Sequence, residues 1–175
     1  MTQSDAIALI DHPFLHAMSP FRWADLGCGS GTFTLALAAL LPPHSTIEAK
    51  DLRPGIAQQT TARGVTIVPR SADFVTADLG LINLDGILMA NSLHYVRDKP
   101  ALLQKLRAYY GTPTQGALLL VEYDTDRPTP HWVPYPLSFA SASKLLPATG
   151  WPNLQKLASR PSAFGRSELY GLPAN

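Results

Sequence analysis

Residues 22–41 have the pattern of a strand, a turn and a helix, and this unit limits the possible folds of the chain more than any other stretch. An apolar run at residues 23–26 leads into a turn with glycine at every second position, and a helical apolar pattern follows. Gly27, Gly29 and Gly31 carry no Cβ, so a ligand can lie directly against the backbone. The N–H groups at the start of the following helix point toward the same space. This stretch therefore predicts a ligand-binding turn at the carboxyl end of a strand.

Short apolar runs alternate with helical patterns along most of the chain. We expect strands over residues 22–26, 46–50, 65–69, 84–90, 116–123, 154–159 and 168–172, and helices over residues 2–10, 31–41, 56–63, 99–110 and 137–146. Pro42 ends the second of these helices and Pro147 ends the last. The alternation predicts an α/β fold with helices on both faces of a mostly parallel sheet. In such sheets, ligands bind outside the carboxyl ends of the strands.

Composition narrows the class of protein. With 175 residues, of which 46% are hydrophobic and 15% charged, the chain is expected to form one domain with a substantial core. The net charge of +1 and the lack of a Lys or Arg run argue against nucleic acid as a partner. No apolar run is as long as a membrane span, and the first ten residues lack the basic start of a signal peptide. Together with a single cysteine, this predicts a cytoplasmic protein without a membrane contact.

The metal-binding residue types are scattered. The sequence has one cysteine and five histidines, with no pairs at metal-ligand spacing. We therefore expect no structural metal.

The glycine turn departs from the dinucleotide-binding pattern G-x-G-x-x-G. Thr32 stands where the third glycine is required, and Asp25 lies two residues before the first glycine. A carboxylate there repels phosphate but suits a cationic ligand, which disfavours a nicotinamide-dependent oxidoreductase. The D-x-G-x-G-x-G pattern over residues 25–31 instead resembles the first motif of the class I S-adenosylmethionine-dependent methyltransferases.

The resemblance extends over roughly residues 20–172 and implies a single-domain, Rossmann-like three-layer α/β/α sandwich. Its mostly parallel seven-stranded sheet would have its last strand antiparallel between two neighbours. Residues 1–20 would form an N-terminal helix and entry segment, and residues 21–123 the cofactor-binding core. Residues 124–150 would supply a lid rich in proline and aromatic residues, and residues 151–175 the C-terminal strands.

The same resemblance implies a binding site for S-adenosylmethionine and its product S-adenosylhomocysteine. Asp51 ends the second strand and would bind the ribose hydroxyls, because a carboxylate accepts two hydrogen bonds at once. Asp73 would accept from the adenine amino group, and Phe74 would pack against the base. The expected cofactor-binding residues are Asp25, Gly27, Cys28, Gly29, Gly31, Asp51, Leu52, Asp73, Phe74, Asn91 and Ser92.

Each of these residues also has a purely structural interpretation. For Asp51 the alternative to ligand binding, which the sequence favours, is a helix cap, whereas Asp73 would serve equally as the cap of a loop. Phe74 would belong to the core, and Cys28 would be a small packing residue without thiol chemistry.

Methyl transfer from a sulfonium requires alignment of the acceptor and exclusion of water, and a hydroxyl acceptor must also lose a proton. His94 is the expected general base, with a backbone hydrogen bond as its alternative role. Glu122 and Asp124 follow as further catalytic candidates, or as parts of a solvated strand end. Tyr95, Tyr123, Trp132 and Tyr135 are the expected substrate-binding residues. The segment 124–136 is expected to cover the substrate, although it reads equally as a rigid surface connection.

The sequence favours a methyltransferase that acts on a small molecule. A methyltransferase of RNA or protein, and a regulatory or partner subunit that binds S-adenosylmethionine without catalysis, remain alternatives. No large substrate-binding insertion is present. This is explained by a small substrate or by a second copy of the chain that completes the pocket as a homodimer, and the sequence leaves both open.

Overall fold

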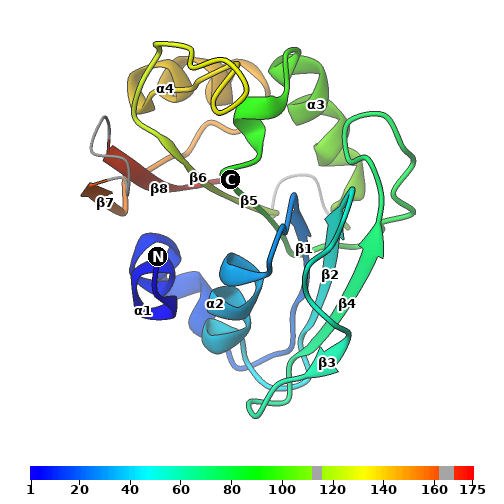
Figure 1. The fold of residues 1–175 in the computed structure, drawn as a ribbon. Coiled ribbons are helices and arrows are strands. Elements are labelled where there is room, and N and C mark those ends of the chain that lie inside the picture. Colours follow the sequence, from blue (N-terminus) through cyan, green and yellow to red (C-terminus); the bar gives the residue numbers. More distant parts are fainter. Residues whose placement is uncertain (112–115, 162–167) are drawn as a thin grey trace.

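A computed structural model of the chain describes residues 1–111, 116–161 and 168–175. One sheet runs through the described residues in the order β3-β4-β2-β1-β5-β6-β8-β7 (Figure 1). Its strands are β1 (Arg22–Leu26), β2 (Thr46–Asp51), β3 (Gln59–Thr60), β4 (Thr66–Ser71), β5 (Gly86–Ala90), β6 (Ala117–Tyr123), β7 (Ala158–Pro161) and β8 (Glu168–Ala174). The five central strands from β4 to β6 are mutually parallel.

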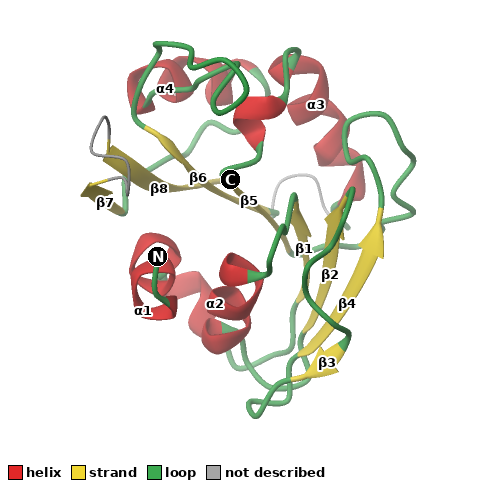
Figure 2. Ribbon diagram, viewed as in Figure 1, coloured by secondary structure: helices red, strands yellow, loops and turns green. Residues whose placement is uncertain are grey.

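Helices cover both faces of this sheet, which confirms the predicted three-layer α/β/α sandwich (Figure 2). On one face lie α1 (Gln3–Ile10) and α2 (Thr32–Leu40), and on the other lie α3 (Lys99–Leu106) and α4 (Phe139–Ala148). Short 3-10 turns are formed by Pro13–His16, Leu93–Tyr95 and Arg107–Tyr109. Two buried apolar clusters result, one between each helical layer and the sheet.

Successive side chains of β1 alternate between these clusters. Trp23 packs with the α1 and α2 side, whereas Ala24 and Leu26 pack with the α3 and α4 side. Asp25 therefore points toward α2, and it is 1% exposed. A strand buried on both faces explains why its sequence is apolar almost throughout.

The antiparallel last strand is also confirmed. β8 lies between β6 and β7 and is antiparallel to both. Residues 162–167, which join β7 to β8, lie outside the described residues.

The helix predicted at residues 56–63 is wrong. Gln59 and Thr60 form the short strand β3, which pairs antiparallel with Ile67 and Thr66 of β4. The main-chain N–H of Thr61 then donates to Val65 at 2.9 Å and closes a tight turn. β-Branched residues favour this extended pairing over an isolated helical turn. The sheet consequently has eight strands in the described residues, and not the seven expected.

The predicted end of the last helix needs a smaller correction. Pro147 lies inside the final turn of α4 and does not stop the helix before it. The helix begins after Ser138, whose hydroxyl accepts from the main-chain N–H of Ser141.

The strand order reverses between β1 and β5, because the chain proceeds from β1 to β2 and β4 on one side and returns to β5 on the other. The carboxyl ends of β1 and β5 therefore flank a topological switch point, where open α/β sheets bind ligands. No helix in the described part of the chain has the length and apolar character needed to cross a membrane.

Candidate functional site

The glycine turn follows β1 and is fixed to the neighbouring strand β2. Gly27 and Cys28 both donate their main-chain N–H groups to the carbonyl of Lys50, at 2.7 and 3.1 Å. All three turn glycines have positive φ, at 84°, 49° and 85° along the chain. These left-handed conformations explain why glycine stands at each position. Cys28 is buried, and burial, together with the charges of Asp25 and Asp51, raises the pKa of its thiol to about 12. A thiol with so high a pKa fits a packing role.

The three glycines face different surroundings. A Cβ on Gly27 would lie 2.4 Å from Cβ of Ser92, and one on Gly31 would lie 2.6 Å from Cδ1 of Ile56. A Cβ on Gly29 would meet no heavy atom within 4 Å. Close packing therefore requires Gly27 and Gly31, whereas Gly29 borders open space. Gly27 and Gly29 both line the cavity described below.

Asp25 is a buried carboxyl group beside this turn. Its Oδ2 atom accepts a hydrogen bond from the hydroxyl of Thr34 on α2 at 2.6 Å. Its Oδ1 atom is buried without a hydrogen-bond partner. Burial raises the pKa of Asp25 to about 7, the Thr34 hydrogen bond opposes the shift, and the charge of Asp51 adds to it. A buried acid with one empty acceptor is well suited to a cationic partner.

Asn91 supplies a second unpartnered acceptor at the end of β5. Its φ is +53°, and its Oδ1 atom is buried without a hydrogen-bond partner. Of the four buried side-chain polar atoms without a partner among the described residues, this oxygen and Oδ1 of Asp25 belong to residues of the same cavity. The cavity measures about 290 Å³ and is lined by Met1, Asp25, Gly27, Cys28, Gly29, Ser30, Thr32, Phe33, Ala90 and Asn91. Two residues that line this cavity therefore each keep a buried acceptor oxygen without a partner, which would suit a ligand that carries hydrogen-bond donors.

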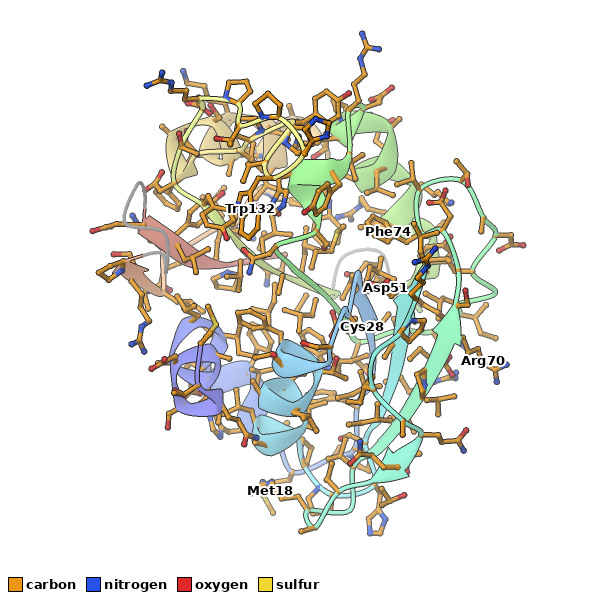
Figure 3. The ribbon with its side chains drawn as sticks, viewed as in Figure 1. Met18, Cys28, Asp51, Arg70, Phe74 and Trp132 are labelled. Carbon is orange, nitrogen blue, oxygen red and sulfur yellow. The ribbon has the colours of Figure 1, made fainter. Side chains whose placement is uncertain are left out.

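Asp51 lies next to the glycine turn, at the end of β2. Its Oδ2 atom accepts from the main-chain N–H of Gly29 at 2.9 Å, and its Oδ1 atom accepts from that of Arg53 at 2.9 Å. The following residue, Leu52, is 67% exposed. Figure 3 shows Asp51 and Cys28 at the same end of β1 and β2, with Phe74 close by. Each carboxylate oxygen retains a further lone pair, so Asp51 is able to accept from a ligand as well.

Asp73 and Phe74 follow β4 on the side of the turn that faces α3. The carboxylate of Asp73 accepts from the main-chain N–H of Val75 and the hydroxyl of Thr76, at 2.9 and 2.8 Å. These bonds lower the pKa of Asp73 and close a local turn. Phe74 packs against the cluster under α3 and comes within 3.4 Å of a Cβ built on Gly27. Asp73 therefore caps a loop beside the glycine turn, and Phe74 packs against the core there.

Ser92 connects the ends of β5 and β1. It is 3% exposed, and its hydroxyl donates to the carbonyl of Leu26 at 2.6 Å. This bond occupies the hydroxyl proton, so Ser92 holds the two strand ends together.

A buried histidine–carboxylate pair lies at the ends of β5 and β6. Nδ1 of His94 is 2.6 Å from Oε2 of Glu122, and the two side chains are 2% and 0% exposed. Oε1 of the same carboxylate accepts the main-chain N–H of His94 at 3.1 Å. Since a carboxylate only accepts, Nδ1 carries the proton and Nε2 is the basic nitrogen of the neutral ring. The structure thus joins two predicted catalytic residues, and a histidine held this way is suited to proton transfer.

Aromatic side chains surround this pair. The ring of Tyr95 is 4.4 Å from that of His94, and the ring of Tyr123 is 5.8 Å away. Trp132 forms a side-chain hydrogen bond with Tyr123, and burial raises the pKa of the tyrosine. The segment 124–136 folds back so that Tyr135 donates its main-chain N–H to the carbonyl of His94 at 3.0 Å. All four expected substrate residues therefore lie around one turn, with Trp132 on the β6 side of the site in Figure 3.

Asp124 stands apart from this group. Its Oδ1 atom accepts from the main-chain N–H of Phe139 at 2.9 Å, at the start of α4. Its Oδ2 atom pairs with Lys156 at 3.1 Å. Both oxygens are engaged in fastening α4 and the C-terminal segment, which is a structural role.

Sequence reasoning missed Thr34 and Lys99. Thr34 places a hydroxyl on the otherwise apolar buried face of α2. A single polar residue in that apolar pattern was the sign of its role in the sequence. Lys99 is 7% exposed at the first position of α3, where the sequence indicates only a solvated helix start.

A second, larger cavity opens at the opposite end of the sheet. It measures about 830 Å³, and residues from the starts of β1 and β6 line it, among them Trp23 and Ala117. None of the predicted site residues reaches it. Within the described ranges, no group of three or more His, Cys, Asp or Glu side chains is placed to hold a metal ion.

Comparison with known proteins agrees with this geometry. Residues 24–110 match the family model described as a methyltransferase domain. No curated protein sequence matches the chain.

Several solved structures share the fold. An arsenic (III) S-adenosylmethionine methyltransferase from Chlamydomonas reinhardtii aligns with a TM-score of 0.70 at 16% identity, over 98% of this chain and 72% of that one. A SAM-dependent methyltransferase from Methanosarcina mazei aligns with a TM-score of 0.67 at 14% identity, over 95% of this chain and 99% of that one.

EvdMO1 is a third protein with this fold. It aligns with a TM-score of 0.60 at 22% identity over 89% of this chain, which spans only 37% of EvdMO1. Its N-terminal domain, crystallised in the presence of SAH and D-fucose, aligns with a TM-score of 0.66 at 20% identity, over 99% of this chain and 82% of that one.

Proposed function

Because this chain belongs to the class I S-adenosylmethionine-dependent methyltransferases, we propose that it methylates a small molecule with His94 as the general base. The observation that carries the proposal is the buried His94–Glu122 pair, which lies at the ends of β5 and β6 among aromatic side chains. Proteins of similar structure include an arsenic (III) methyltransferase and a domain crystallised in the presence of D-fucose. Arsenic (III) and D-fucose are both small, which supports a small acceptor.

The donor site consists of the glycine turn and the acids around it. S-adenosylmethionine, when bound, supplies a methyl group activated by a sulfonium. Asp25 and Asn91 line the cavity beside Gly29, and each keeps one buried side-chain oxygen without a hydrogen-bond partner. We assign these two oxygens to the ammonium of the methionine part. Asp51 retains acceptor capacity for the ribose hydroxyls. Asp73 and Phe74 stand on the adenine side, with Leu52 exposed next to Asp51.

The acceptor side provides base catalysis and a water-excluding surface. The carboxylate of Glu122 keeps the proton of His94 on Nδ1, which leaves Nε2 free to take the acceptor proton. The bond between that proton and the acceptor atom breaks as the methyl group arrives, and Glu122 stabilises the imidazolium that forms. Tyr95, Tyr123, Trp132 and Tyr135 offer flat apolar surface, and Trp132 and Tyr135 are 46% and 40% exposed. This surface suits a neutral acceptor with an acidic O–H or C–H group.

A two-part experiment tests the proposal. Calorimetry with S-adenosylhomocysteine measures donor-site binding, with Asp51→Ala as the negative control. Loss of hydrogen bonds to a charged group weakens binding by about 1.5–3 kcal/mol. Transfer of a labelled methyl group is then assayed on a panel of phenols, sugars and carbon acids, with RNA and protein as competing acceptors. Labelling of a small molecule supports the proposal. Labelling of RNA or protein alone, or binding without any transfer, contradicts it and favours the alternatives.

His94→Asn is the matched variant for the base. Its side-chain amide is able to donate to Glu122 in place of Nδ1, but it has no nitrogen at the Nε2 position. We expect S-adenosylhomocysteine affinity to remain while transfer slows by about 10² or more. Equal rates in the variant and the parent would remove His94 from the chemistry.

A further inference from the structure

Two lysines of α3 each bridge a pair of main-chain carbonyls in loops that flank the site. Lys99 donates to the carbonyls of Val96 and Tyr135, at 2.9 and 2.6 Å. Lys105 donates to those of Val75 and Ala77, at 3.3 and 2.7 Å. The first pair of carbonyls lies on the acceptor side and the second on the side of Asp73 and Phe74. One helix thus reaches both walls of the site.

Lys99 is unusual because its ammonium is taken out of water. The residue is 7% exposed, and no carboxylate in the described residues pairs with its Nζ atom within 4.0 Å. Its charge is met by the two carbonyls and by the ring of Tyr135, whose centroid is 5.7 Å from Nζ. Burial of a lysine is costly unless it is paired or hydrogen-bonded, so these contacts offset the cost of taking the ammonium out of water.

Tyr135 is held on both sides of its main chain. Its N–H donates to the carbonyl of His94 at 3.0 Å, and its carbonyl accepts from Lys99. Lys99 also binds the carbonyl of Val96, two residues after His94. The ammonium therefore joins the turn that carries His94 to the segment that carries Trp132 and Tyr135.

We propose that Lys99 is a positioning residue that holds the segment 124–136 against the turn of His94 and thereby determines acceptor binding. The consequence for the acceptor rests on the proposed function, whereas the fastening itself does not. Without this ammonium, one main-chain hydrogen bond from Tyr135 to His94 and the side-chain bond from Trp132 to Tyr123 would remain near the turn. Loss of the ammonium would take away the donor that the carbonyls of Tyr135 and Val96 now share.

Lys99→Met and Lys105→Met form a matched pair for the test. Both changes remove an ammonium from α3 and keep an unbranched side chain of similar length. Hydrogen exchange of the full chain without ligand is followed by mass spectrometry. We expect Lys99→Met to speed exchange in residues 127–137, and Lys105→Met to speed it in residues 73–80. Unchanged exchange in residues 127–137 of Lys99→Met, or the same pattern in both variants, would overturn the proposal.

Tryptophan fluorescence supplies an independent readout. Trp132 is 46% exposed, whereas Trp23 and Trp151 are 1% and 0% exposed, so iodide quenching reports mainly on Trp132. We expect a larger Stern–Volmer constant in Lys99→Met and no change in Lys105→Met. Lys99→Arg keeps a cationic donor and is expected to restore both signals at least in part. If Lys99→Met does not fold, Lys99→Arg decides alone: parent-like exchange and quenching support the role, and loss of both contradicts it.

The kinetic consequence uses the acceptor that the transfer panel identifies. Lys99→Met should raise KM for that acceptor by roughly tenfold, the effect of one or two lost hydrogen bonds. The Kd for S-adenosylhomocysteine should stay unchanged. An equal loss of donor affinity would mean that Lys99 supports the fold in general. If no acceptor is found, the proposed function fails, and the exchange and quenching results still confirm or reject the fastening.

Discussion

Glu122 holds His94 at two points, through Oε2 on ring atom Nδ1 at 2.6 Å and through Oε1 on the main-chain N–H at 3.1 Å. One carboxylate thus fixes both the tautomer of the ring and the backbone that carries it. Both side chains are almost fully buried, so solvent does not replace either bond. This arrangement separates Glu122 from Asp124, two residues further along, whose oxygens bind Phe139 and Lys156.

Glu122→Gln is therefore expected to impair catalysis. A glutamine side chain has one acceptor oxygen and cannot accept from both groups of His94, and it no longer stabilises an imidazolium. We expect kcat to fall by about 10² or more, with Kd for S-adenosylhomocysteine nearly unchanged. Calorimetry and methyl-transfer assays measure the two quantities.

Asp124→Asn provides the contrast. It loosens the start of α4 and the ion pair with Lys156, so we expect a lower thermal midpoint with kcat preserved. If Asp124→Asn abolished transfer and Glu122→Gln did not, the assignment of the two carboxylates would be reversed.

Asp25 makes the stability of the unliganded protein depend on pH. Its pKa is about 7 in the folded chain, whereas the ordinary value for an aspartate, which applies to the unfolded chain, is 3.8. Between these two pH values the folded state therefore binds more protons than the unfolded state. The free energy of unfolding must then fall as pH rises through this window, by at most about 1.4 kcal/mol per unit. Asp25→Asn removes this cost, so the variant should gain stability over the parent from pH 5 to pH 8. Urea unfolding at both pH values measures the difference, and a gap that does not grow with pH would contradict the burial effect.

The sequence predicted most of the fold because strands buried on both faces leave a distinct apolar pattern. It failed at residues 56–63, where pairing of Gln59 and Thr60 with β4 outweighs local helical preference. The strand-end residues of the site were predictable, because parallel strands end at one edge of a sheet. The bonds of Thr34 to Asp25 and of Lys99 to Tyr135 were not, since they depend on side-chain directions between segments 9 and 36 residues apart.

Gly29 offers a substitution that separates binding from folding. A side chain there meets no neighbour within 4 Å, although its φ of +49° costs a non-glycine residue about 1–2 kcal/mol. Gly29→Leu should thus fold with a modestly lower thermal midpoint but lose S-adenosylhomocysteine binding. Gly27→Ala is the control, because its Cβ would lie 2.4 Å from that of Ser92 and should destabilise the chain more. Parent-like binding by a folded Gly29→Leu would place the donor elsewhere.

Thr34 should tune the pH range in which the donor binds. Its hydroxyl donates to Oδ2 of Asp25 at 2.6 Å and thereby lowers a carboxyl pKa that burial raises to about 7. The ammonium of the donor is attracted only by the ionised carboxylate, so affinity should fall as pH drops below about 7, approaching tenfold per unit. Thr34→Val keeps the volume and removes the hydrogen-bond donor that lowers the pKa of Asp25, so the midpoint should move to higher pH. Calorimetry with S-adenosylhomocysteine from pH 6 to pH 9 follows the shift. Asp25→Asn should bind weakly and without this pH dependence, and a Thr34→Val midpoint equal to that of the parent would show that the hydroxyl does not control the charge of Asp25.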